Sequence, residues 1–354
     1  MNNLSYGNRS IELSDLPRGH GEPVFEGKYR VKASDFLVTE DLGFEPEGIG
    51  PHIWALIRKV GISTEEACLR LGRATKVSRR DLGYAGKKDT HAISIQWVSL
   101  PDSARIDVGS IDSCLKVLRL SRNQRKLKIG QLAGNYFQVR LYGVVMGNLS
   151  ERLKAIGSVG VPNYFGLQRF GRSGSNLERA RQLARRDPSG SRRLHPRDGM
   201  AASAARSAGF NTVVAERLRT DRWLDVTVGD VVSLAGRGSH FPVSEADISN
   251  IQSRIMAGEL DTTAPMAGRI SKTSSEQNAF ETATLQTDPE LFDWMTGIFR
   301  EEDRRAVRVL PKHLEAEVSE NTLQVSFWLP KGSFATAVLN ELGTLRESYA
   351  RTAS

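Results

Sequence analysis

One carboxylate of this chain stands in surroundings that suit catalysis. Asp89 directly follows Lys87 and Lys88 in a turn. The turn carries Gly83 and Gly86, and glycine lets a backbone bend tightly and approach a ligand closely. A single carboxylate among cations can act as a nucleophile or as a general base. The simpler interpretation, that Asp89 only hydrogen-bonds its own backbone, is common for such turns and stays open on this segment alone.

Spacing excludes two other kinds of site. A phosphate-binding loop needs Ser or Thr after its Gly-Lys pair, whereas Gly86-Lys87 is followed by Lys88-Asp89. The six histidines and two cysteines show no spacing typical of metal ligands. We therefore expect no metal site.

A helix and a strand are expected to hold the Asp89 turn in place. The capping-box pattern that starts at Ser63 predicts a helix over about residues 64–75. Apolar and polar residues alternate over 92–97, which predicts a half-buried strand with its two isoleucines and Trp97 on one face. The carboxylate would then sit at the mouth of that strand.

Composition bounds the class of protein. At 354 residues the chain is long for one core, so one large or two ordinary domains are expected. Its 39% hydrophobic and 25% charged residues are typical of a soluble globular protein. No apolar run approaches the roughly 20 residues of a membrane-spanning helix, and the N-terminus lacks a secretory pattern. Two cysteines cannot build a disulfide framework, so we expect a cytoplasmic protein with no membrane partner.

The net charge of +8 is concentrated in three basic clusters. Residues 70–88 and 113–140 each hold seven Lys or Arg, and residues 179–197 hold seven Arg. Solvated faces carry such runs, but three of them favour a polyanion partner. A membrane surface is disfavoured because no basic stretch has a matching apolar face. Nucleic acid is the better interpretation, and we expect the 179–197 arginines to grip it.

Periodicity divides the chain into strand-rich ends and a helical middle. Strands are predicted at 36–38, 53–57, 115–120, 126–129, 136–142, 314–318 and 323–329, and a hairpin at 226–234. Helices are predicted from a capping box at Ser175 to about residue 186, at 200–218 and 244–256, and after an N-cap at Ser333. We expect residues 1–25 to form a flexible arm, 26–160 and 308–354 to share one sheet, and 161–307 to be an inserted domain.

Six stretches in order then resemble the TruD family of tRNA pseudouridine synthases, over roughly residues 26–345. They are residues 35–44, 84–96, 134–137, 163–171, 234–239 and 332–336. The resemblance implies an α+β fold with a V shape: a pseudouridine synthase core of mixed, mainly antiparallel sheet, plus an inserted α/β TRUD domain. It further implies isomerisation of uridine 13 of tRNA to pseudouridine without a cofactor. We expect tRNA as the partner and a monomer as the working form.

The resemblance also assigns roles to single residues. Asp89 falls on the family's catalytic nucleophile, and Phe137 falls on the aromatic beside the target base. The positions that line the uridine pocket are occupied by Phe36, Asn135 and Phe334. Arg30 falls where the family places a basic residue, often Lys, near the catalytic Asp. The sequence departs from the family at Ala33-Ser34, which replaces Pro-Glu, and at Ser94, where Thr is common.

These residues suggest how the reaction would proceed. We expect Arg30 to orient the Asp89 carboxylate, with a phosphate contact as the alternative. The uridine must be flipped out of the folded tRNA, at a cost of a few kcal/mol. Stacking on Phe137 would return about 1–3 kcal/mol of that cost. Whether Asp89 attacks the sugar or acts first as a base stays open.

Two rival functions keep the same basic surface. The chain could bind or fold RNA without catalysis, or it could perform the same chemistry on another RNA, such as messenger RNA. Binding alone needs no carboxylate among the cations, so the Asp89, Asn135 and Phe137 set argues against the first rival.

Overall fold

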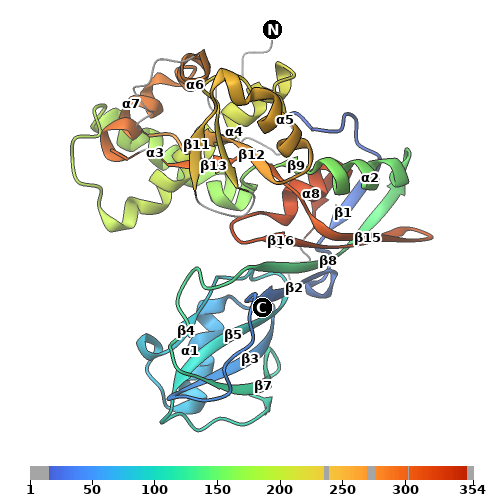
Figure 1. Ribbon diagram of the computed structural model, residues 1–354. Helices are drawn as coiled ribbons and strands as arrows, with labels where there is room; N and C mark the ends of the chain where they lie inside the picture. The colour runs from blue at the N-terminus through green and yellow to red at the C-terminus, as the bar shows by residue number, and fades with distance from the viewer. Residues whose placement is uncertain (1–15, 235–238, 269–275, 302, 349–354) are drawn as a thin grey trace. The chain divides into compact units, whose positions relative to one another are not determined.

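The computed structural model describes residues 16–234, 239–268, 276–301 and 303–348, which divide into two compact units. The sheet unit comprises Pro23–Leu153, Pro311–Gly332 and the chain from Leu342 onward. The helical unit comprises the chain up to Glu22, Lys154–Leu310 and Ser333–Glu341. Figure 1 labels the helices and strands of both units.

The sheet unit is built on one eleven-stranded sheet with the order β15-β16-β8-β2-β5-β3-β7-β6. Off this path, β1 pairs with β8 and β17, and β4 pairs with β5. The pairs β2–β5 and β1–β17 are parallel and the others are antiparallel, so the sheet is mixed, mainly antiparallel, as predicted. Its strands are β1 (Phe25–Tyr29), β2 (Phe36–Asp41), β3 (His52–Val60), β4 (Gly83–Tyr84), β5 (Ile93–Pro101), β6 (Gly109–Ser110), β7 (Leu115–Asn123), β8 (Gly134–Val145), β15 (Lys312–Ser319), β16 (Thr322–Pro330) and β17 (Gly343–Glu347).

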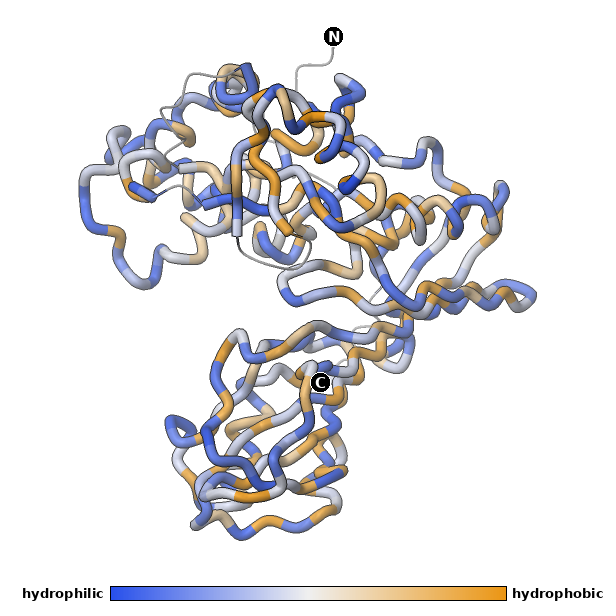
Figure 2. The backbone as a smooth tube through the Cα atoms, viewed as in Figure 1, coloured by the Kyte–Doolittle hydropathy of each residue, from blue (hydrophilic) through white to orange (hydrophobic). Residues whose placement is uncertain are grey.

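The expected union of N-terminal and C-terminal strands is confirmed by the β8–β16 pair. The two strands run antiparallel from the Thr322–Tyr142 pair to the Pro330–Gly134 pair. Every second side chain of β16 is buried, and the tube in Figure 2 alternates between hydrophobic and hydrophilic along it. This alternation fixes the register, because a slip by one residue would turn the apolar set to solvent.

The helix α1 (Thr64–Thr75) covers one face of the sheet next to β5. Ser63 caps it by accepting a hydrogen bond from the Glu66 N–H at 3.1 Å, as predicted. The Thr64 hydroxyl donates to the Gln96 side chain at 2.9 Å. Ser94 and Gln96 are fully buried as a result, so β5 differs from the half-buried strand expected from its alternation.

The helical unit packs its helices around α4 (Gly199–Arg219) and two small sheets. The apolar stripe of α4, which includes Phe210, Val213 and Val214, is fully buried. One small sheet has the order β11-β10-β12-β13 and the other pairs β14 with β9. Its remaining elements are β9 (Val161–Pro162), α3 (Ser175–Arg186), β10 (Val231–Leu234), β11 (His240–Pro242), α5 (Ile248–Met256), β12 (Leu260–Pro265), α6 (Glu276–Leu285), α7 (Pro289–Ile298), β13 (Arg304–Ala306), β14 (Arg308–Val309) and most of α8 (Ala335–Leu342).

The helix α2 (Leu149–Val159) links the two units in the chain. No helix in the part of the chain that the structure describes is long and apolar enough to cross a membrane.

Three local predictions were wrong. The hairpin at 226–234 does not form, because Asp230 is drawn into a buried ion pair with Arg217 and accepts the Thr227 N–H, and β10 pairs instead with β11 and β12. Ser175 does not cap α3, since its N-cap is Gly174 in a left-handed conformation. Residues 126–129 lie in irregular backbone that leads into a turn at 129–130, rather than in a strand.

The two units divide the chain somewhat differently from the expected domains. Ser333–Glu341 clusters with the helical unit, whereas its position after the last strands had placed it with the sheet. Of the expected flexible arm, residues 1–15 lie outside the described residues. The rest is held in place, because the N–H groups of Gly19 and His20 donate to the Glu341 carboxylate at 2.9 and 3.1 Å.

We predict that Ser63→Ala destabilises α1 and that Ser175→Ala leaves α3 unchanged. Only Ser63 accepts a capping hydrogen bond, and losing such a cap costs about 1 kcal/mol. Hydrogen exchange measures this directly: the Glu66 amide should lose protection in Ser63→Ala, while the first turn of α3 should keep its protection in Ser175→Ala. Equal effects in the two helices would contradict the assignment.

Candidate active site

Asp89 and Arg30 form an ion pair in the sheet unit. Asp89 lies in the loop between β4 and β5, and Arg30 directly follows β1. A guanidinium nitrogen of Arg30 donates to the Asp89 Oδ2 atom. The Arg30 side chain is 5% exposed and that of Asp89 is 35% exposed. The cation is therefore buried behind a carboxylate that solvent and a substrate can reach.

Arg30 is fixed from several sides. Its guanidinium carbon lies 4.0 Å from the centre of the Phe36 ring, a close cation–π contact. A second guanidinium nitrogen donates to the Glu347 carboxylate at 2.6 Å. The residue has φ +57°, a left-handed conformation that costs a non-glycine residue about 1–3 kcal/mol and persists only where the surroundings enforce it. The contacts to Phe36, Asp89 and Glu347 supply that enforcement.

Glu347, on β17, is the second carboxylate beside Arg30. It lines a hollow of about 470 Å³ with residues of β1, β8 and β17, among them Lys28 and Arg346. One guanidinium thus serves two carboxylates that are far apart in the sequence. A planar guanidinium with five N–H donors suits this arrangement.

A buried lysine holds the backbone at Asp89. The ammonium of Lys59, on β3, donates to the Asp89 backbone carbonyl at 2.7 Å and to the Ile62 carbonyl at 2.8 Å. The side chain is fully buried, and burial lowers the pKa of Lys59 to about 8, with the charge of Asp89 opposing this shift and that of Lys88 adding to it. The contact ties the loop to the strand that runs beside β5.

A second buried cation holds the neighbouring residue of the loop. Lys88 donates to Glu40, on β2, at 2.6 Å, and both side chains are buried. The other oxygen of Glu40 accepts the Trp97 N–H of β5 at 3.1 Å. Burial raises the pKa of Glu40, and the contact with Lys88 opposes this rise. The Lys88 N–H in turn donates to the Thr64 hydroxyl of α1 at 2.9 Å.

The loop therefore has polar anchors on β2, β3, β5 and α1. On β5, the Gln96 side-chain amide donates to the Gly86 carbonyl at 3.1 Å. Ordinary surface loops carry few such buried bonds. This density of anchors fixes the direction in which the Asp89 side chain leaves the loop.

Phe36 and Phe137 lie on the same face of the sheet, next to Arg30. Their ring centres are 6.1 Å apart in an edge-to-face arrangement. The Phe137 ring also stacks on Phe327 of β16, with centres 5.5 Å apart. The exposed fractions of Phe36, Phe137 and Phe327 are 1%, 8% and 2%. The three rings form a packed aromatic wall beside the ion pair.

Asn135 lies on the same face of β8, two residues before Phe137. Its strand partners are Glu40 on β2 and Leu329 on β16. Its side-chain oxygen is buried and accepts no hydrogen bond from any described residue. A buried acceptor without a donor is costly, so it marks a place where a ligand's N–H would be stabilised.

Phe334, the remaining sequence-predicted residue, belongs to the helical unit. It precedes α8, and its ring centre lies 5.5 Å from that of Phe165. The sheet unit thus brings together Asp89, Arg30 and Phe36 by direct contact, with Phe137 and Asn135 on the same face.

Sequence reasoning missed three residues of this site. Lys59 had a weak signal, since it is one of two adjacent cations, with Arg58, near the end of the mostly apolar run from residue 53 to 60. Glu40 had a weaker one, because it shares the buried parity of Phe36 and Val38 on β2. Glu347 had none, because its partner is 317 residues away in the chain.

Many residues of the three basic clusters are already paired with carboxylates. In the sheet unit, Arg70 pairs with Glu66 and Asp112, and Lys87 pairs with Glu65. In the helical unit, Arg179, Arg181 and Arg185 pair with Asp198, Asp288 and Glu290. Part of the charge that the sequence suggested for nucleic acid is thus neutralised within each unit.

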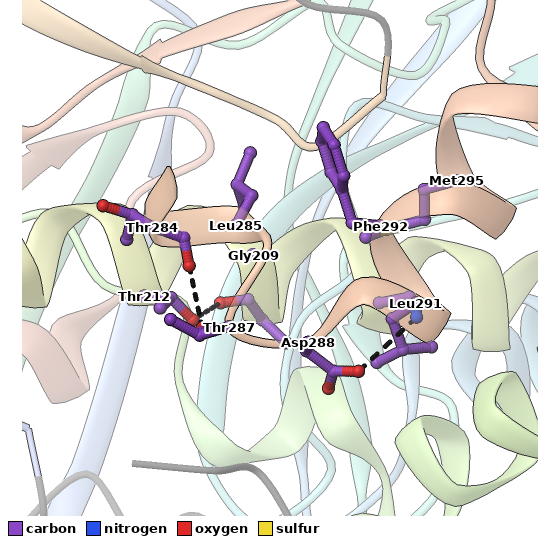
Figure 3. A pocket seen from close by; sticks show the side chains of 11 residues that line it. Gly209, Thr212, Thr284, Leu285, Thr287, Asp288, Leu291, Phe292 and Met295 are labelled. Atoms are coloured by element: carbon purple, nitrogen blue, oxygen red, sulfur yellow. Dashed lines mark hydrogen bonds between the residues drawn. The ribbon is translucent and has the colours of Figure 1, made fainter. Parts of the chain in front are cut away.

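A small cavity in the helical unit lies between α4, α6 and α7 (Figure 3). It measures about 20 Å³, room for a single water molecule, and its lining is mostly apolar, with Leu285, Phe292 and Met295 around it. It is too small for a nucleoside and has no part in a site for one.

Comparison with known proteins identifies the family of this chain. The profile of the tRNA pseudouridine synthase D (TruD) family matches residues 20–194 and 195–342. The tRNA pseudouridine synthase D of Pectobacterium atrosepticum is 39% identical over 333 residues, which cover 91% of this chain and 94% of that protein. A crystal structure from Methanosarcina mazei that carries the same name matches with a TM-score of 0.68 at 22% identity, over 94% of this chain and 96% of that one.

These matches define a pseudouridine synthase, an isomerase of the α+β class. The chain belongs to the tRNA pseudouridine synthase D family.

We predict that Lys59→Met removes a pH dependence of stability. Between pH 8 and 10.5 the unfolded chain still holds a proton on Lys59 that the folded protein has released, so this group makes stability rise with pH. The slope is at most about 1.4 kcal/mol per pH unit. In denaturant unfolding at pH 8, 9 and 10, the free energy of unfolding of the wild type should rise with pH relative to that of Lys59→Met. Parallel curves would contradict the assignment.

Proposed function

We propose that this protein isomerises uridine 13 of tRNA to pseudouridine, with Asp89 as its catalytic carboxylate. The observation that carries the proposal is the Arg30–Asp89 ion pair, in which a buried cation holds an accessible carboxylate. The buried guanidinium keeps its position and charge, while 35% of the Asp89 side chain stays accessible to a substrate. The sheet unit would be the catalytic domain and the helical unit the inserted domain.

The reaction needs one carboxylate and no change in composition. The bond between C1′ and N1 breaks, the uracil turns, and C5 joins C1′. The hydrogen of C5 leaves and N1 gains one, so the product is an isomer of the substrate. Asp89 serves as nucleophile in this scheme, or first as a base, and Arg30 orients it and balances its charge in either role.

Residues around the ion pair would hold the flipped base. The buried oxygen of Asn135 is an acceptor suited to a uracil N–H. Phe36 and Phe137 would form one wall of the pocket, and Phe334 is proposed as a further substrate-binding residue. Because Phe137 already packs on Phe327, part of its contribution would be to shape the wall rather than to stack on the base.

The partner would be tRNA, bound chiefly through phosphates, with no cofactor and with a monomer in the cytoplasm as the working form. Affinity from phosphate contacts weakens steeply with salt. That affinity should survive changes at Asp89 while isomerisation is lost. The loss of isomerisation separates this proposal from a protein that only binds RNA.

We predict that Asp89→Asn abolishes isomerisation and keeps tRNA binding. The amide has the shape of the carboxylate without its charge or nucleophilicity, and a loss of at least about 1,000-fold in kcat is expected. Tritium release from tRNA labelled at C5 of uridine measures turnover, because C5 gives up its hydrogen when it bonds to C1′. Filter binding measures affinity.

Two controls sharpen this experiment. Asp81→Asn changes an exposed acid of the same basic segment and should leave turnover unchanged. A tRNA transcript with cytidine at position 13 should release no tritium. Wild-type turnover by Asp89→Asn would refute the catalytic role. Tritium release from the transcript with cytidine at position 13 would refute the proposed target.

We predict that Arg30→Met lowers kcat by about 10–100-fold and that Arg30→Lys retains most of the activity. A hydrogen bond to a charged group contributes roughly 1.5–3 kcal/mol, and lysine keeps the charge. Turnover at saturating tRNA distinguishes this from a phosphate contact: for the latter, KM would rise in Arg30→Met while kcat stayed at the wild-type value.

A further inference from the structure

Arg169 and Arg305, two partly buried arginines of the helical unit, have no carboxylate partner among the described residues. Arg169 lies in the turn 167–170, and Arg305 lies on β13. Other inward-facing arginines of the unit are neutralised: Arg304, Arg308 and Arg217 bind the buried carboxylates of Glu281, Asp261 and Asp230. Arg169 and Arg305 are each partly buried and make only neutral contacts.

Both arginines pack on the same ring. The guanidinium carbon of Arg305 lies 4.3 Å from the centre of the Phe165 ring, and that of Arg169 lies 5.4 Å from it. Arg305 donates to the Asn163 side-chain oxygen at 2.5 Å, and Arg169 donates to the Ser207 hydroxyl at 3.2 Å. These contacts fix the positions of the guanidiniums without neutralising them.

The positive charges of Arg169 and Arg305 repel each other. Burial and the nearby charge of Arg169 lower the pKa of Arg305 to about 10. Burial and the charge of Arg206 lower the pKa of Arg169. The Arg305 Nε–H is buried and finds no acceptor among the described residues. Partly desolvated like charges with a free donor are stabilised by an anion.

Two sequence motifs meet at this place. Phe165 and Arg169 belong to the 163–171 motif, and Phe334 and Thr336 belong to the 332–336 motif. The Phe334 ring lies 5.5 Å from Phe165. The Thr336 hydroxyl stands 2.6 Å from where a side chain at Gly166 would begin, and its oxygen is buried without a partner among the described residues. Arg169, Arg305, Phe334 and Thr336 all keep some exposed surface.

We propose that Arg169 and Arg305 together bind one phosphodiester group of the RNA substrate, with Thr336 as an additional donor. Arginine pairs suit phosphate because their N–H groups form parallel hydrogen bonds to its oxygens. An aromatic ring at the same place, Phe334, suits a nucleotide better than a free anion. The identity of the anion as RNA rests on the proposed function, whereas the presence of an anion site does not.

The test measures tRNA affinity against salt, using Asp89→Asn protein so that no substrate is consumed. Arg169→Gln and Arg305→Gln should each weaken binding about 10-fold and reduce the slope of log affinity against log salt by about 1. Arg254→Gln removes a partly exposed arginine of the same unit that is already paired with Glu259 and lies outside the three basic clusters, so it is the matched control, with wild-type slope expected.

The double variant tests whether one phosphate is shared. If both arginines hold the same group, Arg169→Gln/Arg305→Gln should reduce the slope by about 1, as each single change does, and the affinity losses should not add. Additive losses with a slope reduced by about 2 would overturn the shared site. An unchanged slope in both single variants would overturn the proposal altogether.

A second measurement changes the RNA as well as the protein. Replacing single tRNA phosphates by neutral methylphosphonates should reveal one position that weakens binding to the wild type but not to Arg169→Gln. If inorganic phosphate alone stabilises the wild type against unfolding and no methylphosphonate position responds, the site binds small anions and the RNA assignment is wrong. Because these experiments measure binding, they remain interpretable if Asp89 proves not to be catalytic.

Discussion

The buried charge of Arg30 is the constraint on which the geometry around Asp89 depends. A guanidinium with 5% of its surface exposed is stable only if nearby carboxylates and an aromatic face replace its hydration. Asp89, Glu347 and Phe36 do so, and they come from the loop before β5, from β17 and from β2. The arrangement of Arg30, Asp89 and Glu347 therefore exists only once β1 and β17 have both joined the sheet, because β17 pairs with β1 directly before Arg30.

The same reasoning explains why the core behind Asp89 is polar. Replacing a buried ion pair such as Lys88–Glu40 by apolar side chains is often neutral for stability or even favourable. Its presence in a fully buried position is therefore better explained by positioning than by stability. Lys59 supports this view, since its ammonium donates to the backbone carbonyls of Asp89 and Ile62 and so fixes the loop.

The sequence predicted the elements whose signals are local. The glycines around Asp89, the alternation in β8 and β16, and the cap at Ser63 all act over a few residues, and the structure contains each of them. The failures involve distant partners. The alternation in β5 predicted one solvent-exposed face, because no residue of that strand indicates that α1 covers this face. A Gly-Asp pair at 229–230 suggested a hairpin, but Asp230 is claimed by Arg217 of α4.

Counting basic residues along the chain has the same weakness for binding. The 179–197 cluster is the densest run of arginine, yet three of its members are bound to Asp198, Asp288 and Glu290. Arg169 and Arg305 are 136 positions apart in the chain and form no cluster in the sequence. They share one ring and have no carboxylate among the described residues. A polyanion is attracted by cations that have no carboxylate partner in the fold. A binding site for RNA is therefore better predicted from unpaired cations than from the density of cations along the sequence.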